Sequence, residues 1–151
     1  MKKVFLFLGL MLCVTMLQAK QIYLNANIWD VDSPAFYAHV WGGGDADVKL
    51  AKVSGTVYSG EVPDGTTSVI FLRMNPEGGF DWSKEWNRTG DLQIPAGKDF
   101  FKITAWHENN DDSKPSVGEW SVYDSTTPGG GDTPGGGGDC EESYGLLIDG
   151  V

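Results

Sequence analysis

The chain has only two cysteines among its 151 residues, Cys13 and Cys140, and few groups that suit catalysis. Cys13 lies in an N-terminal segment that we expect to be removed, so the mature chain keeps Cys140 alone. An internal disulfide therefore cannot hold the fold together. His39 and His107 are the only histidines, and no serine lies in the Gly-x-Ser-x-Gly pattern of a nucleophile elbow. We expect the protein not to be an enzyme.

Basic residues are also scarce, with 11 Lys and Arg against 21 Asp and Glu. Without Lys2 and Lys3, which belong to the N-terminal segment, nine basic residues remain and the net charge is about −12. A surface this acidic repels nucleic acid and anionic membranes, so we expect neither as a partner. Its charge is typical of a soluble protein, which we expect to be a monomer.

Long apolar runs are absent apart from residues 4–17. This run follows two lysines and ends in Gln18 and Ala19, the order of basic, apolar and small residues in a secretory signal peptide. The run is shorter than the roughly 20 residues that a helix needs to cross a bilayer. Residues 1–19 are therefore predicted to be a signal peptide, cleaved after Ala19, that directs the protein to the medium or the cell surface.

Residues 125–139 contain no large apolar side chain and consist mainly of Gly, Pro and Thr in a near-duplicated run. This composition is typical of a flexible linker. Residues 140–151 then predict one strand and an Asp-Gly turn without a returning strand. Because one strand cannot bury itself, we expect 140–151 to begin a second domain, whose remainder would be a partner in the same longer chain.

Helical periodicity is missing between these segments, over residues 20–124, where no apolar pattern lasts longer than about two helical turns. Short apolar segments instead alternate with turn residues, which is the pattern of an all-β sandwich. We predict about eight strands in two packed sheets, over Gln21–Asn25, Phe36–Trp41, Val48–Val53, Val57–Val62, Ser68–Met74, Asp91–Ile94, Asp99–Trp106 and Glu119–Tyr123.

Aromatic residues are the informative feature that is present. Alternation along one predicted strand places Tyr37, His39 and Trp41 on the face away from the core. A row of exposed rings is costly unless it binds something. Alternatively, the polar loop that carries Trp82 and Trp86 covers the row. These two tryptophans are four residues apart, so a helical turn would point both rings the same way, and a lid over the sandwich is an equal alternative.

Flat rings beside amides and a guanidinium suit a sugar. A pyranose stacks its C–H face on an aromatic ring, and its hydroxyls need donors and acceptors such as those of Asn87, Arg88 and Gln93. Affinity at such a site is about micromolar to millimolar, because few contacts offset the freedom lost on binding. The sequence predicts a carbohydrate site drawn from Tyr37, His39, Trp41, Trp82, Trp86 and Asn75.

Three segments carry a family resemblance: 22–30 (IYLNANIWD), 36–42 (FYAHVWG) and 69–95, which includes WSKEWNRTGDLQIP. Together they resemble carbohydrate-binding module family 26, the starch-binding modules, in the version found in secreted proteins of gut Bacteroidetes and some Firmicutes. The resemblance covers about 21–123. It implies an immunoglobulin-like β-sandwich that binds α-glucans such as starch and maltooligosaccharides without catalysis, typically beside an amylase domain.

The same resemblance implies that Tyr37 and His39 stack on glucose units. The chain departs from the family pattern at 45–49, which has no tryptophan. Either Trp41 or Trp82 substitutes for it, or sugar binding is weakened or lost. Two other functions stay open. One is a structural or adhesive surface module, and the other is an accessory module of a glycoside hydrolase whose catalytic domain lies beyond Val151.

Three acidic segments, 30–32, 45–47 and 109–112, offer carboxylate and carbonyl oxygens of the kind that calcium prefers. None of them forms a complete calcium loop, and solvated turns explain their composition more simply. We therefore expect no cofactor, with a structural calcium ion as the alternative.

Overall fold

Residues 19–126 are described by the computed structural model, and ten strands within them form two sheets. This confirms the all-β prediction. Three short 3-10 turns are the helical elements of this part, and it contains no helix long and apolar enough to cross a membrane. The predicted signal peptide up to residue 18, the linker from residue 127 and the segment 140–151 lie outside the described residues.

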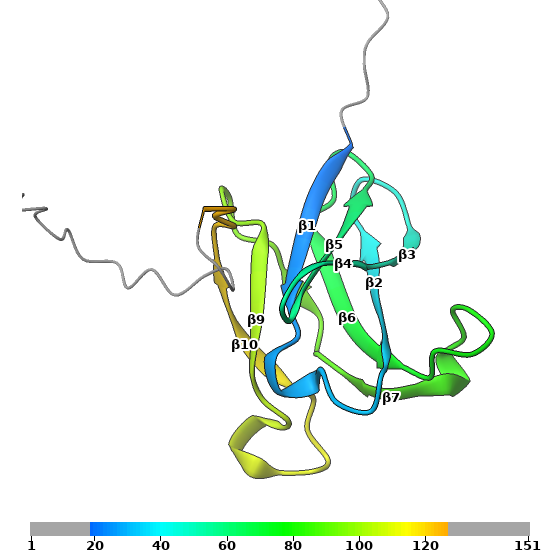
Figure 1. The fold of residues 1–151 in the computed structure, drawn as a ribbon. Coiled ribbons are helices and arrows are strands. Elements are labelled where there is room, and N and C mark those ends of the chain that lie inside the picture. The colour runs from blue at the N-terminus through cyan, green and yellow to red at the C-terminus, as the bar shows by residue number, and fades with distance from the viewer. Residues whose placement is uncertain (1–18, 127–151) are drawn as a thin grey trace, which may run out of the picture.

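The first sheet has the strand order β10-β9-β1-β5-β4 (Figure 1). Neighbouring strands are antiparallel, except that β1 and β9 are parallel. The first strand of the domain therefore lies in the middle of its sheet, beside a strand from the far end of the domain. The members are β1 (Lys20–Asn25), β4 (Ala51–Ser54), β5 (Val57–Val62), β9 (Phe100–Ala105) and β10 (Val117–Ser121).

The second sheet has the order β3-β2-β6-β7, and β8 also pairs with β6. All of its pairs are antiparallel, and β2 pairs with β6 along its full length. The members are β2 (Ala35–Trp41), β3 (Ala46–Lys49), β6 (Ser68–Met74), β7 (Glu85–Arg88) and β8 (Leu92–Gln93).

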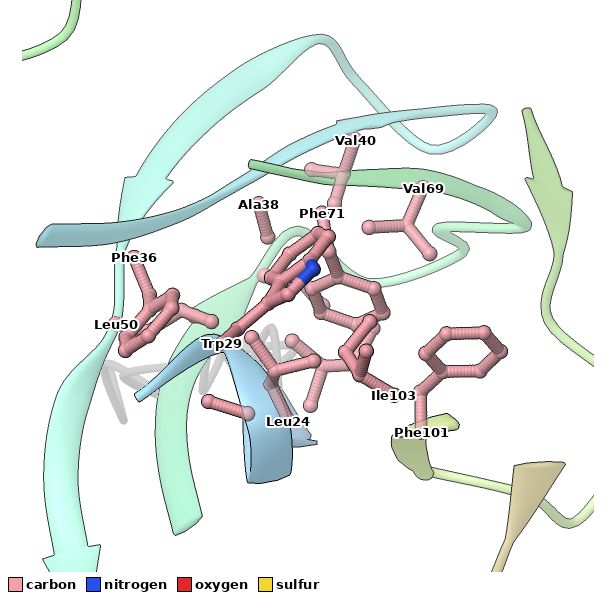
Figure 2. Close-up of a cluster of buried hydrophobic side chains, with 13 residues drawn as sticks. Leu24, Trp29, Phe36, Ala38, Val40, Leu50, Val69, Phe71, Phe101 and Ile103 are labelled. Carbon is pink, nitrogen blue, oxygen red and sulfur yellow. The ribbon is translucent and has the colours of Figure 1, made fainter. Parts of the chain in front are cut away.

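The core lies between the two sheets and follows from side-chain alternation. Phe36, Ala38 and Val40 of β2 face inward as predicted, and β6 is buried on both of its faces. Figure 2 shows these side chains meeting residues of the first sheet around Trp29 of the turn Asn27–Trp29. Trp29 is fully buried, and its indole Nε1 has no hydrogen-bond partner, a cost that the apolar packing offsets.

Two differences from the predicted strands have a physical reason. The single strand expected over Val48–Val53 is divided between the sheets, because the chain crosses at Leu50, which is buried and donates its N–H to Phe36 O at 2.9 Å. Strand β7 was not predicted, since its sequence Glu-Trp-Asn-Arg is polar. It lies at the edge of its sheet, and none of its side chains is fully buried, so the strand needs few apolar residues.

One edge of the sandwich is joined by a short link between the sheets. Thr89, after β7, forms a parallel bridge with Ser116, just before β10, and the Ser116 N–H donates to Arg88 O at 2.9 Å. Thr89 and Ser116 are both buried. The segment from His107 to Ser116 is thereby held beside β7, at the bottom of the view in Figure 1.

Candidate functional site

Five rings gather on the face of β2 that points away from the core. Tyr37, His39 and Trp41 share this face, as predicted, and two further rings join them from the segment 75–84. The ring centroids form a chain: Tyr37 to Phe80 at 5.5 Å, Phe80 to Trp82 at 5.3 Å, Trp82 to His39 at 5.2 Å and His39 to Trp41 at 5.7 Å. We call these residues the outer aromatic cluster.

Exposure differs strongly within the outer aromatic cluster. Tyr37 is only 4% exposed, because Phe80, Leu72 and Met74 pack around its ring. The expectation that the Tyr37 ring is exposed is therefore wrong, and the side chain supports the cluster from below. Trp82 is 43% exposed, and His39 and Trp41 are partly exposed, so these three rings form the accessible part.

The loop that carries Phe80 and Trp82 is held by local polar bonds. The Asp81 carboxylate caps the turn Trp82–Lys84 by accepting from the Ser83 N–H at 2.9 Å and from the Ser83 hydroxyl at 2.7 Å. At the base of the loop, the Asn75 N–H donates to Lys84 O at 3.0 Å. These bonds fix the loop over β2, although the loop has no apolar core of its own.

The cap predicts a measurable acid response. Hydrogen bonds from Ser83 hold the pKa of Asp81 below its ordinary value of 3.8. A lowered pKa means that the cap is intact above the ordinary value and is lost as the pH falls through the lowered value. We expect the NMR signal of the Ser83 amide to titrate with a midpoint below about 3.8. Asp81→Ala should abolish this titration and raise the hydrogen-exchange rate of that amide.

The Ser113 amide is an internal control for this experiment, because Asp111 caps it in the same way at 2.9 Å. Its titration should persist in Asp81→Ala. An unchanged Ser83 titration in that variant would contradict the cap.

His39 is oriented by Asp47 on the neighbouring strand. The two residues lie directly opposite each other in the pairing of β2 with β3, and His39 Nδ1 is 2.7 Å from Asp47 Oδ1. The carboxylate places a ring proton on Nδ1, so Nε2 of the neutral imidazole is left as an acceptor. The Asp47 carboxylate is itself partly exposed. A ligand on the cluster thus meets polar groups beside the rings.

Trp86 lies apart from Trp82, although the sequence grouped them. Only Trp82–Lys84 is helical, and the chain then enters β7, whose pairing with β6 is shifted by a bulge between Arg73 and Met74. The Trp86 ring lies on the Arg73 guanidinium, 4.7 Å from ring centroid to Cζ, and Trp106 contacts the same group at 5.5 Å. The two rings therefore do not share one surface.

Most of the predicted polar partners are used within the fold. Asn75 Oδ1 accepts from the Glu77 N–H at 2.9 Å, Asn87 Oδ1 accepts from Arg73 at 3.4 Å, and the Gln93 amide donates to Ser68 Oγ at 2.9 Å. Sequence reasoning missed Phe80, whose spacing of two residues from Trp82 was the available signal. It also missed Trp106, which no local pattern linked to the others.

The three acidic segments are engaged in protein contacts. Asp30 accepts from the Tyr58 hydroxyl at 2.9 Å, Asp32 pairs with Arg73 at 3.2 Å, Asp47 with His39, and Asp111 with Ser113. Across residues 19–126, no group of three or more His, Cys, Asp or Glu side chains is placed to hold a metal ion.

Comparisons with protein-family models, with curated proteins and with solved structures found no match. The resemblance to the family 26 modules thus rests on the three sequence segments alone.

Proposed function

We propose that the protein is a non-catalytic α-glucan-binding module and that its binding surface is the exposed part of the outer aromatic cluster. The observation that carries the proposal is Trp82. Its ring is 43% exposed, yet it is held by Phe80, by His39 and by the Asp81 cap. A large ring fixed before binding loses little conformational freedom when a sugar stacks on it.

The arrangement of the rings favours an α-glucan over a flat β-linked chain. The His39 plane is inclined by 71° to Trp82 and by 37° to Trp41, so the exposed rings do not form one plane. Successive glucose units of an α-1,4-linked chain are also inclined to one another, whereas those of a β-1,4-linked chain form a ribbon that suits coplanar rings. His39 Nε2 and Asp47 supply polar partners for the hydroxyls.

The remaining parts of the proposal follow the resemblance stated above. We assign the sandwich to the immunoglobulin-like class, and we propose export through residues 1–19 to the medium or the cell surface. Residues 125–139 would tether the module to a further domain. If that domain is a glycoside hydrolase, the module has an accessory role beside it. These assignments are supported by sequence segments 1–19, 22–30, 36–42, 69–95 and 125–139.

Affinity electrophoresis in amylopectin tests the function. The protein should be retarded in gels that contain amylopectin and should migrate freely in gels with α-1,6-linked dextran. Trp82→Ala should weaken the retardation by about 5- to 30-fold, because ring stacking and the apolar area buried on one face of the indole contribute roughly 1–2 kcal/mol. Unretarded migration of the folded protein in amylopectin would refute the proposal.

Val53→Ala is a matched control for Trp82→Ala. Val53 is 44% exposed, close to the exposure of Trp82, and it lies on β4 in the other sheet. Its removal should leave the retardation unchanged. Equal losses in the two variants would show that the outer aromatic cluster is not the binding surface.

A structural or adhesive surface module is the second candidate. The observation in its favour is that Tyr37 is buried and that Trp86 and Trp106 contact an internal arginine, so several of the rings serve the fold itself. A folded protein that is not retarded by any glucan in affinity electrophoresis would support this candidate.

A further inference from the structure

A groove of about 360 Å³ opens between β7 and the segment from His107 to Ser116. This volume lies in the range of pockets that hold small ligands. The groove shares no residue with the outer aromatic cluster. The residues that matter for its chemistry are Glu85, Trp86, Arg88, Asp91, His107 and Lys114.

We propose that this groove is a second carbohydrate-binding site, which takes a glucosyl unit of the same class of α-glucan. The inference rests on the proposed function for the choice of sugar. It adds that one module contacts the polysaccharide at two separate points.

Trp86 is the ring on which the sugar would stack. One face of its indole lies on the Arg73 guanidinium, and the side chain is still 40% exposed. Arg73 is itself fixed, since its side chain is 8% exposed and donates to Trp29 O at 2.9 Å and to Val31 O at 2.7 Å. The ring is therefore held from below by an immobile group, and its open face is ready for a ligand.

The polar lining of the groove suits a neutral polyol. Arg88 and Lys114 supply donors, and Glu85 and Asp91 supply acceptors, so the four charges cancel and do not select an anion. Arg88 is 52% exposed while its Nε lies 3.5 Å from Glu85 Oε1. Every sugar hydroxyl both donates and accepts, which matches a lining with both kinds of group.

His107 fixes the far wall of the groove. Its Nδ1 lies 2.9 Å from Lys114 O, and its Nε2 lies 3.7 Å from Asp112 Oδ1, so the loop is tied to itself across seven residues. The bridge between Thr89 and Ser116 then ties this loop to the strand that carries Trp86. Both walls are thus connected by backbone bonds, as a preformed site requires.

Two weak sites on one module change the response to a polymer. When one site is occupied by a polysaccharide, the other meets glucosyl units at a raised effective concentration, so polymer affinity exceeds that for a short sugar. A short oligosaccharide such as maltotriose gains nothing from the second site, and two molecules should bind independently.

An NMR titration of the full chain with maltotriose tests the inference. Two separate sets of amide shifts are expected, one at His39 and Trp82 and one at Arg88 and Lys114. Trp86→Ala should abolish the second set and change the dissociation constant of the first by less than twofold. The same variant should weaken retardation in amylopectin by about tenfold.

Lys114→Ala is the companion variant, because this exposed residue lines the groove without touching Arg73, so its loss does not disturb the packing beneath Trp86. It should raise the dissociation constant of the second set of shifts at least threefold. The thermal midpoint of unfolding should be unchanged. Shifts at His39 and Trp82 alone would overturn the second site and leave the proposed function standing. Shifts at the groove alone would overturn the proposed surface instead, and no shifts at all would overturn both.

Discussion

Replacing Arg73 with methionine is expected to lower the free energy of unfolding by about 3–5 kcal/mol, because hydrogen bonds from a charged donor contribute roughly 1.5–3 kcal/mol each. Arg73 points inward from β6, and its guanidinium donates to the carbonyls of Trp29 and Val31. Methionine fills similar space but leaves both carbonyls without this donor. Trp86 and Trp106 also lose the cation that they contact.

Urea denaturation measures this loss, and Arg88→Met is the matched control. Arg88 lies on the neighbouring strand, is 52% exposed and pairs with Glu85 at the surface. Exposed ion pairs contribute about 0–1 kcal/mol, so the control should lie within that range. Arg73→Lys should fall between the two variants, since an ammonium keeps the charge but not the planar fork that reaches several acceptors. Equal losses for Arg73→Met and Arg88→Met would contradict the role assigned to the guanidinium.

Tyr37→Ala is expected to cost about 2–4 kcal/mol of stability, the usual range for removing a large buried side chain where the surroundings collapse in part. The ring is covered by Phe80 and by residues of β6, so its loss opens a cavity beneath the loop 75–84. Tyr37→Phe should change stability by less than about 1 kcal/mol, because it keeps the ring and its packing.

Variants of Tyr37 and Trp82 distinguish a role in stabilising the outer aromatic cluster from a role in binding the glucan. Tyr37→Phe should keep its retardation in amylopectin, because Tyr37 is buried and offers no face to a sugar. Trp82→Ala should show the opposite profile, with binding lost and a smaller loss of stability than Tyr37→Ala causes, since Trp82 is 43% exposed and Tyr37 is buried. Thermal denaturation and affinity electrophoresis on the same samples measure both quantities. A stable Tyr37→Ala that fails to bind would show that Tyr37 contacts the ligand directly.

The strands that were predicted well are those that carry a strong apolar pattern, either alternating, as in β2, or nearly continuous, as in β6. Along β2, large inward residues alternate with Tyr37, His39 and Trp41, and the strands Val57–Val62 and Ser68–Met74 have the predicted bounds. Local pattern is sufficient there because each side chain meets a distinct face. It failed at Leu50, where the chain passes from one sheet to the other, and at β7, where a polar edge strand is stabilised by pairing with β6.

The site was harder to predict because it depends on contacts between distant segments. The row on β2 followed from alternation, but the burial of Tyr37 depends on Phe80, which lies 43 residues away in the chain. The spacing of Trp82 and Trp86 suited a helical turn, yet pairing with β6 and its bulge turned Trp86 toward Arg73. The carbonyls that accept hydrogen bonds from Arg73 lie in the segment before β2. The pattern of residues along β6 contains no information about that segment.

The parallel pairing of β1 with β9 determines when the domain can fold. Tyr23 of β1 lies opposite Phe100 of β9, and β5 flanks β1 on the other side (Figure 1). The first strand of the domain therefore cannot complete its pairing until β9, near the end of the domain, is available. The pairing also requires the intervening chain to close a long loop. Such non-local pairing slows folding. We expect the domain to fold only once β9 has left the ribosome, in a single late step rather than hairpin by hairpin.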